Sequence, residues 1–142
     1  MTQRILIATD GTELSRRAVA AGVGLAQQLG AAVVGCAALP SYPYHGVGEA
    51  APAEVIFGAQ AAAAANNHLD EAEKTAADAG VKFTRVLREG HPDDIILQTA
   101  DAEGCDLIVM ASHGRRGVAS LLLGSETQKV LARSRIPVLV VR

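Results

Sequence analysis

The chain has 142 residues and a net charge of -2 at neutral pH, and 49% of its residues are apolar but only 3% are aromatic. This length is typical of one domain, and no apolar run approaches the roughly 18 residues of a membrane-spanning helix. Nucleic-acid-binding proteins need a basic face and stacking rings, which this composition does not favour. We therefore expect one domain, residues 1–142, with neither nucleic acid nor membrane as a partner.

The N-terminal segment and the cysteines indicate a cytoplasmic protein. The first residues reach an acid at Asp10 and lack the hydrophobic region and cleavage site of a signal peptide. Cys36 and Cys105 lie in or next to apolar runs, which is typical of reduced and partly buried thiols in the cytosol. They do not form the CxxC pattern of a zinc site, so we expect no structural zinc.

Predicted strands alternate with predicted helices along the whole chain. Five segments have the length and composition of strands: residues 4–8, 31–39, 81–88, 106–110 and 136–141. Four segments have helical patterns: residues 13–29, 53–79, 92–103 and 126–134. Strands separated by helices form a parallel sheet with right-handed crossovers. We therefore expect an α/β fold with a single doubly wound, Rossmann-like sheet of five parallel strands and helices on both faces.

Two local features belong to this fold prediction. In the first helix, the spacing places five residues on one side: Leu14, Ala18, Ala21, Leu25 and Leu29. Gly22 and Gly24 also lie inside this helix, where packing or flexibility explains a glycine pair better than nucleotide binding does.

Ligands of doubly wound sheets bind beyond the carboxyl ends of the strands. Three such ends contain candidate site residues, namely Ala8–Asp10, Ala38–Leu39 and Met110–Ala111. If the first and fourth strands are neighbours, these ends line one site.

The C-terminal stretch from residue 106 to 142 contains a strand, a glycine-containing loop and a helix start. This order builds anion sites from backbone N–H groups. Residues 125–128 have the S-x-x-Q form of a capping box, which predicts Ser125 as the N-cap of the last helix. Beyond this capping role, the Gly124 backbone and the hydroxyls of Ser125 and Thr127 are candidates for binding a phosphate.

Charged and polar residues around this stretch leave alternatives open. Asp10 either caps the first helix or approaches the ligand or its metal. Arg115 and Arg116 either add positive charge to the site or form a solvated face. His113 is better explained as a residue that orders the loop than as a general base. Walker, GxSxG and HExxH motifs are absent from the sequence, so we predict no catalytic residue and no metal ligand.

The same stretch resembles the signature of the universal stress protein family, which is Gly-x-x-Gly, nine residues, then Gly-Ser/Thr. Here it reads Ala111-Ser112-His113-Gly114, nine residues, then Gly124-Ser125. The resemblance covers the whole chain: residues 5–10 resemble the family's first strand and its turn with aspartate, residues 90–92 its Gly-x-Pro turn, and residues 136–141 its last strand.

This resemblance implies strand order 3-2-1-4-5 and bound ATP, or alternatively ADP or AMP, with or without Mg²⁺ or Mn²⁺. The positions that match the family's contacts are Ala8, Thr9 and Asp10 near adenine and ribose, Ala38 beside adenine, Met110, Ala111 and Gly114 at the ribose and phosphate turn, and Gly124, Ser125, Glu126 and Thr127 at the phosphate-binding helix start. Arg115 would add charge from the loop.

Ala111 departs from the family signature, which has glycine at this position. Alanine costs about 1 kcal/mol or more if the position needs a positive φ. It fits without cost if the position needs only a small side chain beside the ribose.

The resemblance also implies a homodimer, formed by antiparallel pairing of the apolar last strand, residues 136–141, which would otherwise be an exposed edge. We expect an ATP-binding stress-response or signalling module, non-catalytic or only weakly ATP-hydrolysing, that acts on a regulatory protein. The alternatives are a slow metal-dependent ATPase or phosphotransferase, and a family member that binds no nucleotide and acts through dimerisation.

Overall fold

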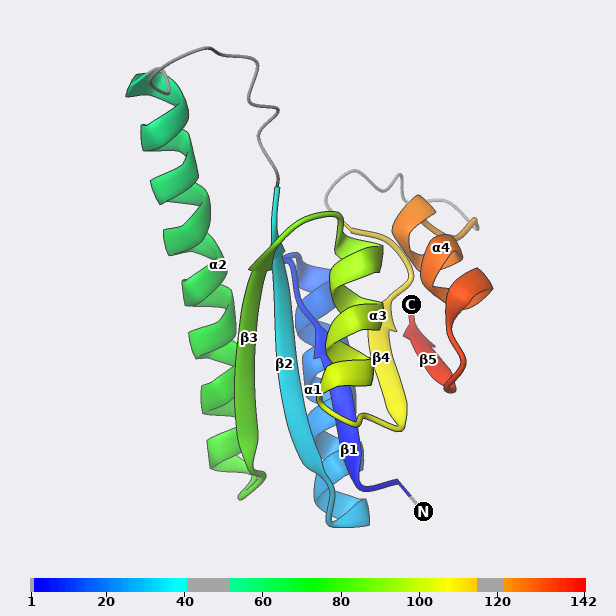
Figure 1. Cartoon of the computed structure of the whole chain (residues 1–142). Helices are drawn as coiled ribbons and strands as arrows, with labels where there is room; N and C mark the ends of the chain where they lie inside the picture. Colours follow the sequence, from blue (N-terminus) through cyan, green and yellow to red (C-terminus); the bar gives the residue numbers. More distant parts are fainter. Residues whose placement is uncertain (1, 41–51, 115–121) are drawn as a thin grey trace.

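The protein is described by a computed structural model that places residues 2–40, 52–114 and 122–142. In chain order the elements are β1 (Arg4–Ala8), α1 (Glu13–Leu29), β2 (Ala32–Leu39), α2 (Pro52–Asp78), β3 (Phe83–Glu89), α3 (Pro92–Ala102), β4 (Leu107–Ala111), α4 (Ser125–Arg133) and β5 (Val138–Val141). The strands form a single parallel sheet of order β3-β2-β1-β4-β5 (Figure 1). The predicted fold class and strand order are therefore confirmed.

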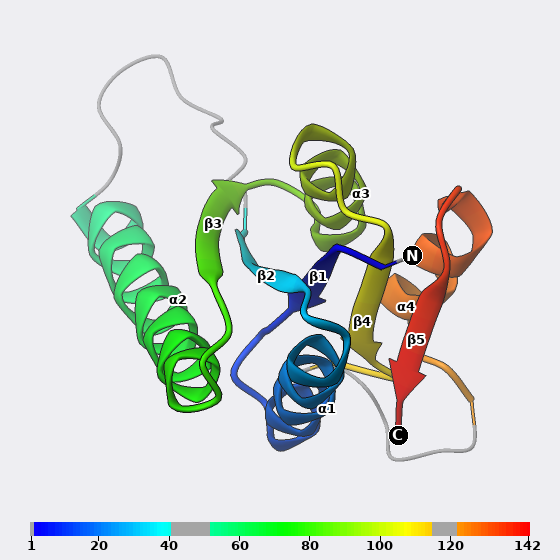
Figure 2. The same ribbon diagram turned by 90° about the horizontal axis from the view of Figure 1, so that it is seen from below.

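Helices cover both faces of the sheet in the described part of the chain (Figure 2). On one face, α1 and α2 pack on residues such as Ile5, Ile7 and Val109, and on the other, α3 and α4 pack on Leu6 and Ile108. The alternation within β1 follows from the pleat of a strand, which points successive side chains to opposite faces. Because β1 lies at the centre of the sheet, both of its faces are covered by helices, as expected for a parallel sheet.

The buried side of α1 differs by about one residue from the apolar side that the spacing indicates. Leu29 is 49% exposed and Ala21 is exposed, whereas the buried residues are Ser15, Ala18, Val19, Gly22, Val23 and Ala26. Small side chains face the sheet because the helix lies very close to it: a Cβ on Gly22 would lie 2.5 Å from Cδ1 of Ile7. The packing explanation of Gly22 is thus confirmed.

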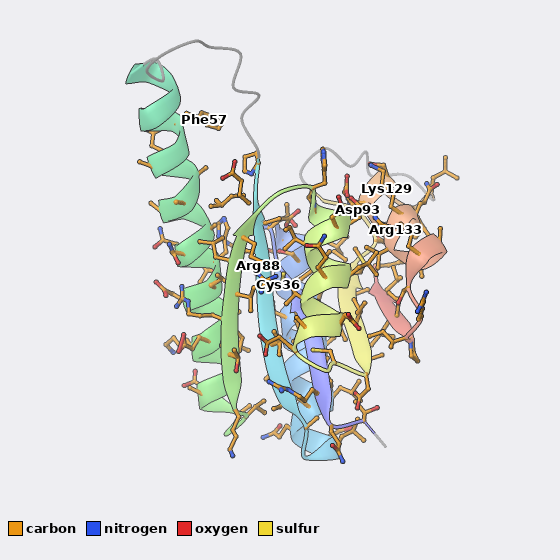
Figure 3. All side chains as sticks on the ribbon, viewed as in Figure 1. Cys36, Phe57, Arg88, Asp93, Lys129 and Arg133 are labelled. Atoms are coloured by element: carbon orange, nitrogen blue, oxygen red, sulfur yellow. The ribbon has the colours of Figure 1, made fainter. Side chains whose placement is uncertain are left out.

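Both cysteines are unpaired, as predicted, and both are buried. Cys36 lies on β2, below the carboxyl end of the strand, and β3 carries Arg88 beside it (Figure 3). Burial raises the pKa of the Cys36 thiol to about 11, although the Thr99 hydroxyl and the Arg88 guanidinium act in the opposite direction. Burial likewise raises the pKa of Cys105 to about 11.

The native thiols are therefore expected to react at least a hundredfold more slowly with an aromatic disulfide reagent, at about pH 8, than the thiols of the unfolded chain. The raised pKa values also stabilise the native state fully below the unfolded thiol pKa of about 8.5. This stabilisation is lost as the pH rises through about 11. Absorbance of the released reagent in native and denatured protein measures the reactivity, and equal rates would contradict the prediction.

No helix in the three described segments is long and apolar enough to cross a membrane.

Candidate functional site

The carboxyl ends of β2, β1 and β4 lie next to one another, as predicted. Ala8 pairs with Cys36 of β2, and Ile7 pairs with Val109 of β4. The Thr9 N–H extends the ladder by donating to the Cys36 carbonyl at 2.9 Å. The sheet thus brings together the predicted site residues that end three strands or directly follow them, namely Ala8, Thr9, Asp10, Ala38, Met110 and Ala111.

Asp10 holds the N-terminus of α1 indirectly. The N-cap is Thr12, whose hydroxyl oxygen accepts the Ser15 N–H at 3.2 Å. The Asp10 Oδ1 accepts the Thr12 N–H at 3.0 Å and the Thr12 hydroxyl at 2.7 Å. Of the two roles predicted for Asp10, direct capping of the helix is therefore wrong, because Thr12 occupies the cap and Asp10 orients it.

The second carboxylate oxygen of Asp10 faces the loop after β4. A Cβ on Gly114 would lie only 2.6 Å from Asp10 Oδ2, so a side chain at this position would collide with the carboxylate. Gly114 does not have a positive φ. Glycine is present here because the two loops approach closely, and this approach places an anionic oxygen between β1 and β4.

The turn that carries Asp10 also contacts α2 through His68. Gly11 has φ 80, and a Cβ at this residue would lie 2.2 Å from Cε1 and Nε2 of the His68 ring. His68 therefore packs against the backbone of the site, although the sequence offered no signal for it. A histidine on a helix 57 residues away along the chain becomes a neighbour of Gly11 only when α2 docks on the sheet.

The first turn of α4 differs from the predicted capping box. The helix begins at Ser125, its N-cap is Gly124, and no side chain caps it. The Gln128 amide donates to the Leu123 carbonyl at 2.7 Å instead of closing the box. The prediction of Ser125 as N-cap is wrong because Gly124, the residue before it, contacts the chain at the end of β4 and takes the N-cap position. The Gly124 N–H donates to the Ser112 carbonyl at 2.7 Å.

Gly124 is needed for this contact with the end of β4. A Cβ on Gly124 would lie 3.0 Å from the His113 Cα and 3.3 Å from the Ser112 carbonyl oxygen. Its N–H is used within the protein, so the amide of Gly124 is not available to a phosphate in this arrangement. His113 in turn forms a hydrogen bond of 3.3 Å between its Nδ1 and the Ser112 hydroxyl, which agrees with a role in ordering the loop.

Thr127 joins α4 to the same strand end. Its side chain is buried, and its hydroxyl lies 2.9 Å from the Ala111 carbonyl oxygen and 3.1 Å from that of Ser112. Because a hydroxyl has one proton to donate, this geometry uses it inside the protein. The interpretation of the Thr127 hydroxyl as a phosphate donor is therefore wrong, and the side chain positions the helix instead.

The Thr127→Val variant is expected to lower the free energy of unfolding by about 1–3 kcal/mol. Valine has nearly the same shape, but it leaves the carbonyls of Ala111 and Ser112 without this buried donor. Chemical denaturation measures the change, and Thr127→Ser, which keeps the hydroxyl, is the control. A serine variant that is destabilised as much as the valine variant would show that packing, and not the hydrogen bond, holds the helix.

Backbone N–H groups remain available at the start of α4. The first N–H groups of a helix have no partner within it, and Gln128 is the first residue to pair, with the Gly124 carbonyl at 3.0 Å. Within the described part of the chain, the N–H groups of Ser125, Glu126 and Thr127 make no hydrogen bond. They lie at the positive end of the helix dipole, which suits an anion.

Comparisons with known proteins show the family to which the chain belongs. A model of the universal stress protein family matches residues 1–142. The chain belongs to the universal stress protein family. It is 38% identical over 148 residues to "Universal stress protein in QAH/OAS sulfhydrylase 3'region" from Thermus aquaticus, and the match covers 100% of both chains.

Two solved structures of universal stress proteins share the fold. The protein MJ0577 of Methanocaldococcus jannaschii is 27% identical with a TM-score of 0.81, and the match covers 99% of this chain and 96% of that one. A universal stress protein solved in complex with cAMP is 30% identical with a TM-score of 0.75, and the match covers 99% of this chain and 97% of that one. Nucleotide binding thus occurs in a structural neighbour.

In this universal stress protein, Ala111 causes no backbone strain. It is the last residue of β4 and pairs with Val141 of β5. No non-glycine residue in the described segments has a positive φ. The alternative in which alanine costs energy because the signature needs a left-handed conformation is therefore excluded, and a requirement for a small side chain remains. Arg115 and Arg116 lie outside the described residues.

Proposed function

We propose that this universal stress protein binds an adenine nucleotide, ATP above all, at the carboxyl ends of β2, β1 and β4. The observation that carries the proposal is the first turn of α4, whose N–H groups at Ser125, Glu126 and Thr127 lie beside the end of β4 and make no hydrogen bond within the described chain. The neighbouring universal stress protein in complex with cAMP supports an adenine nucleotide as the ligand.

We propose that each element of the site binds one part of the nucleotide. The adenine would lie near Ala8, the Thr9 backbone and Ala38, and both alanine side chains are small and partly buried. The Asp10 carboxylate would accept hydrogen bonds from the ribose hydroxyls, beside Met110 and Ala111. The phosphates would follow Gly114 to the first turn of α4, with Arg115 as an additional positive charge.

The Thr9 hydroxyl is not available for the ligand, because it lies 3.4 Å from both the Ser15 hydroxyl oxygen and the Gly11 nitrogen. This leaves the Thr9 backbone as its contribution to the site. A Mg²⁺ or Mn²⁺ ion would enter with the nucleotide, since magnesium is usually held by phosphate oxygens and only one or two carboxylates. Asp10 is the acid within reach of Gly114, where we propose that the phosphates bind.

We infer a binding and signalling role in the cytoplasm, with at most weak hydrolysis, in which the nucleotide state is passed to a regulatory protein. Efficient phosphoryl transfer needs a residue that orients the attacking water and charges that stabilise the transition state. The described carboxyl edge offers a helix N-terminus and the Asp10 carboxylate, which already orients Thr12. These groups suit binding better than turnover.

Isothermal titration of the purified protein with ATP, ADP, AMP and cAMP, with and without Mg²⁺, tests the proposal. We expect saturable binding of ATP and much weaker binding of adenosine, which lacks the phosphates. If no binding is detected at millimolar ATP, the proposal is wrong. The alternative of a protein that binds no nucleotide and acts through dimerisation would then be favoured. Phosphate release over many turnovers would instead favour the ATPase, provided that a variant that no longer binds ATP also no longer releases phosphate.

We also propose a homodimer through β5. This strand is at one edge of the sheet and pairs with β4 on its other side. Leu139 is 42% exposed, and Pro137 precedes the strand, so no proline interrupts the free edge. An apolar open edge is a hazard unless another chain pairs with it. Sedimentation velocity should show a dimer that Leu139→Lys weakens, and a wild-type monomer at about 100 µM would contradict this proposal.

A further inference from the structure

A group of charged side chains joins the start of α3 to α4 (Figure 3). We call it the α3–α4 tie and define it by Asp93, Asp94, Glu126 and Arg133. The Nη1 atom of Arg133, on the last turn of α4, lies 2.6 Å from Asp93 Oδ2 and 2.7 Å from Asp94 Oδ1. At the other end of α4, Glu126 Oε2 accepts the Asp93 N–H at 3.2 Å. The tie therefore connects both ends of α4 to the start of α3.

Glu126 acts as a cap for the neighbouring helix. Asp93 is the second residue of α3, which begins at Pro92, and the N-cap of that helix, His91, makes no side-chain hydrogen bond to it. A helix start has N–H groups that need acceptors and carries partial positive charge. The carboxylate of Glu126 supplies both the acceptor and the negative charge from another helix.

The same Glu126 belongs to the first turn of α4, where we place the phosphates. A carboxylate at that position would stabilise the end of its own helix and repel a phosphate bound there. In the structure its carboxylate is directed to α3 and lies 3.5 Å from Lys129. The positive end of α3 and the Lys129 ammonium thus offset its charge.

Arg133 is the positive partner of the two aspartates in this arrangement. Asp93 is only 6% exposed, and its carboxylate lies in the same cluster as those of Asp94 and Glu126. Without the guanidinium, a buried carboxylate would lose its partner and the remaining acids would repel one another. A movement of Glu126 and of the first turn of α4 away from α3 would relieve this repulsion.

We propose that the α3–α4 tie positions the first turn of α4 and holds the Glu126 carboxylate away from the phosphate site. Arg133 and Asp93 are then positioning residues that set the affinity for the phosphate groups without touching the nucleotide. This inference rests on the proposed nucleotide-binding function.

The first test compares Arg133→Gln with Arg135→Gln. Both variants lose one positive charge from neighbouring positions, but Arg135 is exposed and forms no ion pair with any described residue. Titration with ATP and with adenosine separates phosphate binding from base binding. We expect Arg133→Gln to weaken ATP binding about tenfold and adenosine binding less than twofold, and Arg135→Gln to change neither.

A conservative variant guards against a simple folding defect. One nitrogen of Arg133 contacts both aspartates, so the single ammonium of a lysine can replace it. We expect Arg133→Lys to restore most of the ATP affinity. Equal losses of ATP and adenosine binding in Arg133→Gln, or equal ATP binding by the Arg133→Gln and Arg135→Gln variants, would overturn the inference.

The second test needs no nucleotide. Amide hydrogen exchange of Asp93 should become about tenfold faster in Glu126→Ala, which loses the acceptor, and stay near the wild-type rate in Glu126→Gln, which keeps one. An unchanged exchange rate of the Asp93 amide in Glu126→Ala would show that Glu126 does not cap α3, and it would overturn the inference. If the wild type binds neither ATP nor adenosine, the proposed function is wrong. The amide hydrogen exchange of Asp93 in the Glu126 variants still decides whether Glu126 caps α3.

Discussion

The Ser125→Pro variant is expected to bind ATP about ten- to a hundredfold more weakly than the wild type, with nearly unchanged stability. Proline at this position removes one N–H group from the first turn of α4, and a hydrogen bond to a charged group contributes about 1.5–3 kcal/mol. The fold should accept the change because Ser125 is the first residue of the helix, where proline is favoured. Gly124 has ψ 158, which suits a residue before proline.

The matched control for this prediction is Ser125→Ala, which loses the hydroxyl but keeps the N–H. Isothermal titration with ATP measures the affinity, and urea denaturation confirms that both variants are folded. If proline and alanine weaken ATP binding equally, the backbone amide does not bind the phosphates. The proposed role of the α4 start would then be wrong even if the protein binds ATP.

The Leu6→Ala variant is expected to lower the free energy of unfolding by about 3–4 kcal/mol. Leu6 is fully buried in β1, the central strand, beneath α3. Removing Cγ and its two methyl groups loses their transfer energy and leaves a cavity that close-packed neighbours fill only in part. Because domains of this size are stable by only about 5–15 kcal/mol, the loss is a large share of the total.

Leu29→Ala is the control for Leu6→Ala. It is the same chemical change at a residue that is 49% exposed at the end of α1, so we expect a loss below about 1 kcal/mol. Urea denaturation of both variants measures the difference. A similar loss of stability at both positions would contradict the difference in burial between Leu6 and Leu29. It would instead support a buried Leu29, on the apolar side of the helix that the residue spacing indicates.

Local patterns were enough to predict the elements of this fold. Apolar runs such as residues 4–8 indicated buried strands, and glycine or proline at positions such as Gly30 and Pro92 indicated where helices end or begin. Parallel strands joined by helices leave few topologies, so the common edge that carries Thr9, Ala38 and Met110 could be expected as well. The family signature added the strand order, which the sheet confirms.

The sequence by itself determined the alternating strands and helices, the parallel sheet and the glycine spacing of the signature, because each depends on residues close together in the chain. Only the tertiary structure decided how the side chains at the site are used. Thr127 donates to carbonyls 15 and 16 residues away, and Glu126 accepts an N–H 33 residues away. A hydroxyl or carboxylate beside a helix start has several possible partners, and the partner it takes depends on how neighbouring elements pack. For the same reason, the spacing of α1 could not show that small residues, and not Leu29, face the sheet.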